Sequence, residues 1–326
     1  MLQCSAPIQS EQALWYRLRP RIRGIADELG VAPPIGELDA VFARTFSRPH
    51  GDPEYPKNQL QPGALPLEWS FSEGDPDALR IELQPFDPVL SGEKRFYATL
   101  RALSSLIEAH HDKELANQFS SAAQLSVSSL SKLTFGAFLG LVHRPFQNHE
   151  YKIYVECGPD QPFMITHDLS TVTGIVPHFV SVSVSGRNIS ERVYYICRDG
   201  LRILDLEAVC AALGLSYRFP AMLMRILELT EGKFYLPPTS VLLGIRRQRE
   251  ESELKVELIC DTAMRLDGLI ARIERSLQPG NVAAFRRWLA VIHQGNARPL
   301  RVNVVSVKSS TLHSERLTVY AADPCG

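Results

Sequence analysis

The sequence lacks the short motifs by which many nucleotide-dependent and hydrolytic enzymes are recognised. Its 326 residues contain neither GxGxxG nor GxxxxGKS/T, the glycine-rich loops that cradle phosphates in nucleotide-binding proteins. A GxSxG nucleophile elbow is also absent. These absences argue against dinucleotide cofactors, nucleotide hydrolysis and serine-hydrolase chemistry.

An excess of positive charge, a secretory signal and a membrane span are missing as well. Lys and Arg total 35 against 36 Asp and Glu, which argues against a nucleic-acid partner. The N-terminus has no basic segment followed by an apolar one, and no run approaches 18 apolar residues. The six cysteines form no CxxC pair, and three lie in strand-like runs, which is typical of buried thiols in a reducing compartment. We therefore expect a cytoplasmic protein that binds neither nucleic acid nor membrane.

Paired strand-like runs separated by helical segments make up most of the chain. Residues 1–48 carry apolar side chains at helical spacing, and residues 49–64 form a loop rich in Pro, Gly and Asn. Alternating apolar and polar residues then recur in five predicted hairpins: 65–72 with 78–86, 135–144 with 151–157, 178–185 with 191–197, 240–247 with 253–260, and 300–307 with 316–321. Helices are predicted at 92–133, 204–214, 219–231, 265–277 and 281–294, whereas 160–175 shows little periodicity.

Ten antiparallel strands can form an open sheet, two sheets or a closed barrel. A barrel ringed by helices covers the apolar strand face and leaves no exposed edge. We therefore predict an α+β fold in which residues 1–326 form one domain. It would hold a ten-stranded antiparallel β-barrel built from five αββα units, with N-terminal helices in residues 1–48 and hairpins in residues 65–321.

The alternation sorts each strand into an apolar and a polar face. In the first strand Leu67, Trp69 and Phe71 share one face, and Glu68 lies on the other with two serines. A barrel of about ten strands is wide enough for a cavity, which the polar face would line. A sheet with one face open to solvent explains the alternation equally well.

A cation near the start or middle of the second strand in every hairpin favours the barrel. In a closed lumen these cations would repel one another unless an anion neutralised them, and a diphosphate suits Arg and Lys. The alternative is ordinary surface charge paired with glutamates. The five predicted cations are Arg80, Lys152, Arg192, Lys255 and Arg316.

Tyrosines accompany three of these cations on the same strand face. Tyr154 and Tyr194 follow their cations by two residues, and Tyr320 follows Arg316 by four. Their rings would shield a carbocation and their hydroxyls would donate to phosphate. The alternative is that tyrosine is simply a good strand former.

Short motifs in these strands resemble the dimethylallyltryptophan synthase group of ABBA prenyltransferases, most of all its compact bacterial members. The motifs are Pro66-Leu67-Glu68-Trp69-Ser70, Leu79-Arg80-Ile81 before Gln84-Pro85, Lys152-Ile153-Tyr154, and Leu317-Thr318-Val319-Tyr320. The resemblance runs from about residue 60 to the end. Departures are Gln84 in place of Glu, Arg192-Val193-Tyr194 in place of Lys-x-Tyr, and Lys255-Val256-Glu257, which loses a tyrosine.

The resemblance implies transfer of a dimethylallyl or geranyl group from its diphosphate to an indole-containing acceptor in natural-product biosynthesis. By this resemblance the diphosphate ligands are Arg80, Lys152, Arg192, Lys255 and Arg316. The residues that shield the allylic carbocation from water are Tyr154, Tyr194 and Tyr320. Glu68 would hold the indole N–H and remove a proton. Since no DDxxD-type cluster occurs, no metal is expected to be obligatory, with Mg²⁺ only an optional companion of the diphosphate.

Other acceptors and other roles remain open at this stage. The acceptor is alternatively a phenol or a peptide, and a noncatalytic barrel would bind a hydrophobic anionic ligand instead. Glu68 and Glu82 resemble a glycosidase pair, but such an enzyme has no need of the cations. We expect a monomer or a weak homodimer.

Overall fold

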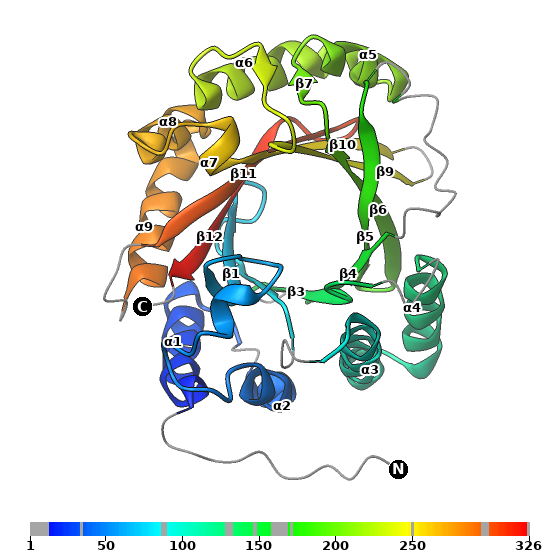
Figure 1. The fold of residues 1–326 in the computed structure, drawn as a ribbon, viewed down its shortest axis with the longest axis vertical. Coiled ribbons are helices and arrows are strands. Elements are labelled where there is room, and N and C mark those ends of the chain that lie inside the picture. Colours follow the sequence, from blue (N-terminus) through cyan, green and yellow to red (C-terminus); the bar gives the residue numbers. More distant parts are fainter. Residues whose placement is uncertain are drawn as a thin grey trace.

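Ten antiparallel strands close into a barrel in the order β1–β12–β11–β10–β9–β6–β5–β4–β3–β2 (Figure 1). The structure is a computed structural model that describes residues 13–32, 35–85, 90–127, 133–145, 149–157, 169, 172–248, 251–294 and 300–324, with only the backbone at 35 and 37. The strands are β1 Ala64–Ser72, β2 Leu79–Leu83, β3 Ala137–His143, β4 Glu150–Glu156, β5 Ile175–Ser185, β6 Asn188–Cys197, β9 Val241–Gln248, β10 Glu251–Ile259, β11 Arg301–Ser310 and β12 Arg316–Pro324.

Helices lie on the outer side of this barrel (Figure 1). Two of them begin at side-chain caps, where Ser91 accepts a hydrogen bond from the backbone N–H of Lys94, and Asp112 from that of Leu115. No helix within the described ranges is long and apolar enough to cross a bilayer. The helices are α1 Leu14–Leu29, α2 Ile35–Thr45, α3 Gly92–His110, α4 Lys113–Leu125, α5 Asp205–Ala212, α6 Phe219–Thr230, α7 Cys260–Ala263, α8 Leu269–Ser276 and α9 Val282–His293.

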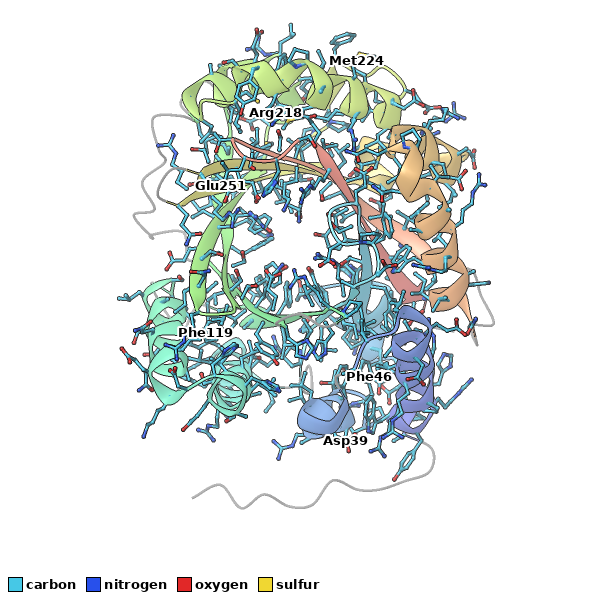
Figure 2. All side chains as sticks on the ribbon, turned by 180° about the vertical axis from the view of Figure 1, so that it is seen from behind. Asp39, Phe46, Phe119, Arg218, Met224 and Glu251 are labelled. Carbon is cyan, nitrogen blue, oxygen red and sulfur yellow. The ribbon has the colours of Figure 1, made fainter. Side chains whose placement is uncertain are left out.

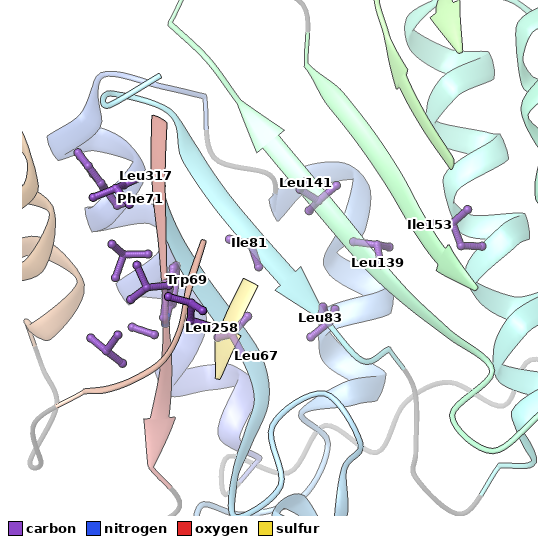
Figure 3. Close-up of a cluster of buried hydrophobic side chains, with 14 of the residues drawn as sticks. Leu67, Trp69, Phe71, Ile81, Leu83, Leu139, Leu141, Ile153, Leu258 and Leu317 are labelled. Atoms are coloured by element: carbon purple, nitrogen blue, oxygen red, sulfur yellow. The ribbon is translucent and has the colours of Figure 1, made fainter. Parts of the chain in front are cut away.

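The apolar residues of the strands point outward against these helices (Figure 3). On β1 the ring of Phe71 lies 5.3 Å from that of Phe285 and 5.9 Å from that of Trp288, both on α9. Burying one such side chain stabilises the fold by about 1.5–3 kcal/mol. Slipping β1 by one residue would move Leu67, Trp69 and Phe71 into the lumen, so this packing sets the register that turns Glu68, Ser70 and Ser72 inward.

The predicted barrel and all five of its hairpins are confirmed. Strand β2 ends earlier than predicted, at Leu83, and β11 continues further, to Ser310. A small sheet of β7 (Leu201–Arg202) and β8 (Tyr235–Leu236) was not predicted, because two residues are too few to show an alternation. Most of the segment 160–175 lies outside the described residues.

Candidate active site

The barrel interior contains two adjoining cavities with different linings. One, of about 540 Å³, is lined mainly by charged residues and serines, and we call it the polar cavity. The other, of about 440 Å³, is lined by Phe135, Phe138 and Phe179 among others, and we call it the aromatic cavity. Figure 2 shows strand side chains entering the barrel interior, while Phe119 and Met224 belong to the helices outside it. The residues that line both cavities are Glu82, Tyr154, Tyr194 and Tyr320, which we call the junction.

Seven cations line the polar cavity and exceed the four carboxylates that share its wall. The carboxylates are Glu82, Glu150, Glu251 and Glu253. This excess of positive charge in the cavity wall is suited to an anion. The cations are Arg80, Lys152, Arg192 and Lys255, as predicted, and Arg144, Arg246 and Lys308, which were not predicted.

Each of the four predicted cations has a partner of its own. Arg80 lies 3.3 Å from a carboxylate oxygen of Asp75, and the ammonium of Lys152 lies 3.1 Å from Glu150. Arg192 of β6 is paired with Glu253 of β10, one strand beyond the neighbouring β9. Lys255 is paired with Glu257 and donates a hydrogen bond to the hydroxyl of Tyr320 at 2.6 Å. These contacts hold the cations in place before an anion arrives.

Crowding among the cations shifts the pKa of Lys308. Burial lowers the pKa of this ammonium well below its usual value, and the charges of Arg192, Lys152 and Arg80 lower it further. The pKa of Lys152 is lowered as well, chiefly by burial. Lys255 behaves differently, because against the effect of burial Glu257 and the tyrosines around it raise its pKa. A bound anion would relieve the repulsion at Lys308 and Lys152.

The fifth predicted cation, Arg316, does not line the polar cavity. It occupies the first position of β12, where one guanidinium nitrogen lies 3.3 Å from Nδ1 of His313. The same side chain lies against Gly74, beside the turn after β1. The structure therefore brings four of the five predicted cations together and leaves Arg316 near the end of the barrel.

The three unpredicted cations belong to the first strands of their hairpins or follow them. Arg144 comes directly after β3, Arg246 lies on β9 and Lys308 lies on β11. The recurrent cations of the sequence pattern lie on the second strands, so the pattern does not include these three residues. Cross-strand pairing would have identified Lys308, because it lies opposite Lys255 on one side and opposite Arg316 on the other.

The three predicted tyrosines meet at the junction, and all are buried. The rings of Tyr154 and Tyr194 have their centroids 6.3 Å apart. The ammonium of Lys255 lies 5.7 Å from the ring centroid of Tyr194 and 4.9 Å from that of Tyr320. The three tyrosine rings therefore lie where the polar cavity meets the aromatic cavity.

Two glycines make room for these rings. A Cβ atom on Gly140 of β3 would lie 3.0 Å from the ring of Tyr154, and one on Gly244 of β9 would lie 2.9 Å from that of Tyr194. Gly244 stands directly opposite Tyr194. Because each glycine lacks a side chain, the tyrosine ring can lie across its backbone.

Glu68 is buried in the wall of the aromatic cavity. One of its oxygens accepts hydrogen bonds from the side-chain amides of Gln61 and Asn303, both at 2.6 Å. Burial raises the pKa of Glu68 well above its usual value, and the charge of Glu82 raises it further. Glu68 is thus a buried carboxyl group with a raised pKa in the wall of the aromatic cavity.

No family model and no curated sequence matches this chain. Among solved structures, 5-dimethylallyltryptophan synthase from Streptomyces coelicolor superposes with a TM-score of 0.72 at 15% identity, over 97% of this chain and 99% of that one. For 6-dimethylallyltryptophan synthase from Micromonospora olivasterospora the TM-score is 0.73 at 15% identity, over 95% and 97% of the two chains.

The chain has the fold of these prenyltransferases. A likeness at 15% identity establishes the fold, and the chemistry has to be argued from the site itself. Among the residues that the structure describes, no group of three or more His, Cys, Asp or Glu side chains is placed to hold a metal ion.

Proposed function

We propose that this protein transfers a dimethylallyl or geranyl group from its diphosphate to an indole-containing acceptor. The observation that carries the proposal is the junction, where three tyrosines join a cation-lined cavity to an aromatic one. An allylic diphosphate has an anionic head and an apolar chain, and an indole is flat and apolar. The polar cavity matches the charge of the diphosphate, and the aromatic cavity matches the aromatic character of the indole.

The cations of the polar cavity would bind the diphosphate and stabilise it as it leaves. Cleavage of the allylic C–O bond places an electron pair on the diphosphate, and positioned Arg and Lys groups lower the energy of that charge. Arg80, Lys152, Arg192 and Lys255 would do this together with Lys308. Arg316 lies beyond the cavity wall, so we leave it out of this anion site.

The junction tyrosines would protect the allylic cation until it meets the acceptor. Their π faces attract a cation, and their bulk keeps water away from a species that water converts to an alcohol. Tyr154, Tyr194 and Tyr320 would thereby favour carbon–carbon bond formation over hydrolysis.

The aromatic cavity would hold the acceptor ring against Phe135, Phe138 and Phe179, while Glu68 accepts a hydrogen bond from the ring N–H. Asp261 and Arg301 line the same cavity and form an ion pair of 2.7 Å, with each side chain about half exposed. Opposite charges at this position suit the ammonium and carboxylate of a free amino acid. Free tryptophan is therefore the first acceptor to test.

Related structures support this choice of substrates. The Micromonospora enzyme has been solved with DMASPP and Trp, and the prenyltransferase PriB with L-tryptophan and dimethylallyl thiolodiphosphate. PriB has also been solved with product diphosphate.

The test is a calorimetric titration with dimethylallyl thiolodiphosphate, first without metal and then with Mg²⁺. We expect micromolar binding that Lys152→Ala weakens, whereas the control Lys57→Ala, at an exposed lysine, leaves it unchanged. Turnover of dimethylallyl and geranyl diphosphates is then measured with tryptophan, tryptamine and a phenol. Absence of binding by the wild-type protein under both metal conditions would refute the proposal, and binding without turnover would indicate a noncatalytic barrel.

A further inference from the structure

Two carboxyl groups face each other in the lumen. Glu68 on β1 and Glu82 on β2 are directly paired across the two strands, and therefore point to the same side of the sheet. Both line the aromatic cavity. Given the proposed function, on which this inference rests, the acceptor ring loses a proton, and both carboxyl groups lie in the wall of the cavity proposed for that ring.

The hydrogen bonds of the two groups differ. Glu68 accepts from the amides of Gln61 and Asn303, whereas Glu82 accepts from the hydroxyl of Tyr154 at 2.7 Å. A phenol that donates to a carboxylate stabilises negative charge there. Tyr154 thus supplies a hydrogen-bond donor that would stabilise Glu82 as a carboxylate.

Two neighbouring buried carboxyl groups do not both ionise readily, so one of them retains a proton. Burial and the charge of Glu82 raise the pKa of Glu68, which favours Glu68 as the group that keeps the proton. Glu68 is therefore a poor base as long as Glu82 is charged.

The position of Glu82 also differs from that of every other carboxylate in the cavity walls. Among the described residues that line the cavities, it is the one carboxylate common to both. The reacting carbon of the donor starts in the polar cavity, and the acceptor ring lies in the aromatic cavity. The new bond must therefore form at the junction, beside Glu82.

We propose that Glu82 is the base that removes the proton from the alkylated ring carbon. The donor C–O bond breaks with its electron pair on the diphosphate, and a π pair of the ring forms the new C–C bond. The C–H pair then returns to the ring, while the proton passes to a carboxylate oxygen of Glu82 and leaves with the diphosphate. Glu68 keeps its own proton and positions the ring nitrogen.

Lys255 and the hydroxyls of Tyr154 and Tyr320, which lie at or beside the junction, are poor bases. The pKa of Lys255 is raised, so its ammonium has no free electron pair. The hydroxyl of Tyr154 already donates to Glu82, and burial raises its pKa. The Tyr320 hydroxyl accepts a hydrogen bond from Lys255.

The decisive experiment compares Glu82→Gln with Glu68→Gln, using acceptors with hydrogen or deuterium on the ring carbons. We expect Glu82→Gln to lower kcat about 100-fold, since this is a typical loss when a general base is removed. A primary deuterium isotope effect should appear in this variant, because proton loss becomes rate-limiting. Glu68→Gln should mainly raise the KM for the acceptor and leave the isotope effect unchanged.

Binding of dimethylallyl thiolodiphosphate is the control for structure, and Glu274→Gln at α8 is the control for the loss of a distant carboxylate. Glu82→Gln should bind the analogue as tightly as wild type. If it turns over at close to the wild-type rate, or if it loses analogue binding in parallel with kcat, Glu82 is not the base. A wild-type protein that neither binds the analogue nor turns over would instead refute the proposed function.

Discussion

Lys255 and Lys308 stand directly opposite each other on β10 and β11, and both lie in the wall of the polar cavity. Like charges at directly opposed positions destabilise a sheet, so this pair needs a compensating negative charge. Glu253 supplies part of it, at 3.4 Å from the ammonium of Lys308. Glu253 does not cancel the repulsion completely. Burial and the neighbouring cations still lower the pKa of Lys308 well below its usual value.

Donor binding should therefore take up a proton at Lys308. The diphosphate would raise the lowered pKa of this ammonium. At a pH between the pKa of Lys308 in the free protein and its pKa in the complex, the protein therefore gains a proton when the donor binds. Calorimetric titration with the thiolodiphosphate in Tris and in Hepes should give different apparent enthalpies, because the two buffers differ in ionisation enthalpy. Lys308→Met should remove most of the difference and weaken binding. Equal enthalpies for the wild-type protein in the two buffers would contradict this prediction.

A methyl group added at Gly140 should displace the ring of Tyr154, which is proposed to protect the allylic cation from water, without preventing the protein from folding. The new Cβ would lie 3.0 Å from the ring of Tyr154 and 3.2 Å from Cβ of Lys152, so the ring must move. We expect Gly140→Ala to lower kcat several-fold and to raise the fraction of donor that ends as allylic alcohol. Product analysis by chromatography measures both quantities.

Gly24 provides the matched control for this substitution. It lies inside α1, and a Cβ there would meet nothing within 4 Å. Gly24→Ala should leave the alcohol fraction unchanged and stabilise the protein by up to about 1 kcal/mol, because Ala is the better helix former. An alcohol fraction in Gly140→Ala equal to that of Gly24→Ala would show that Tyr154 does not limit access of water.

The barrel was predictable because its signal is local. Each strand alternates between residues that pack on helices, such as Trp69, and residues that do not, such as Glu68, and two-residue periodicity survives without tertiary information. The cations at Arg80 and Lys152 could be assigned to the lumen for the same reason. Their positions follow directly from the face of the strand on which they lie.

The rest of the site depends on how the strands pair and where each one ends. Arg246 and Lys308 reach the polar cavity through their partners on neighbouring strands, and a single sequence does not state those partners. Arg316 lies on the expected face, but its position at the start of β12 places it past the cavity wall. The pairing of Glu68 with Glu82 likewise depends on the β1–β2 register.

Outside the barrel wall, three histidines come together in a cluster that the sequence did not indicate. The ring of His143, at the end of β3, stacks on that of His149 with centroids 4.0 Å apart, and His149 lies 6.0 Å from His110. Nδ1 of His143 lies 3.2 Å from the carbonyl oxygen of Ala32. Burial and, to a smaller extent, the charge that His149 would carry lower the pKa of His143 to about 3.

This cluster should make the protein less stable in mild acid. A histidine whose pKa is lowered by folding stabilises the native state fully above its unfolded pKa of about 6.5, and that stability is lost as the pH falls towards 3. At pH 5 the expected loss is about 2 kcal/mol relative to pH 7. Urea unfolding measures the free energy of unfolding at pH 7 and at pH 5. The decrease between the two pH values should be about 2 kcal/mol smaller in His143→Gln than in wild type. Gln does not titrate, and all other titrating groups are common to both proteins. Equal losses in the two proteins would mean that His143 is not held neutral in the native state.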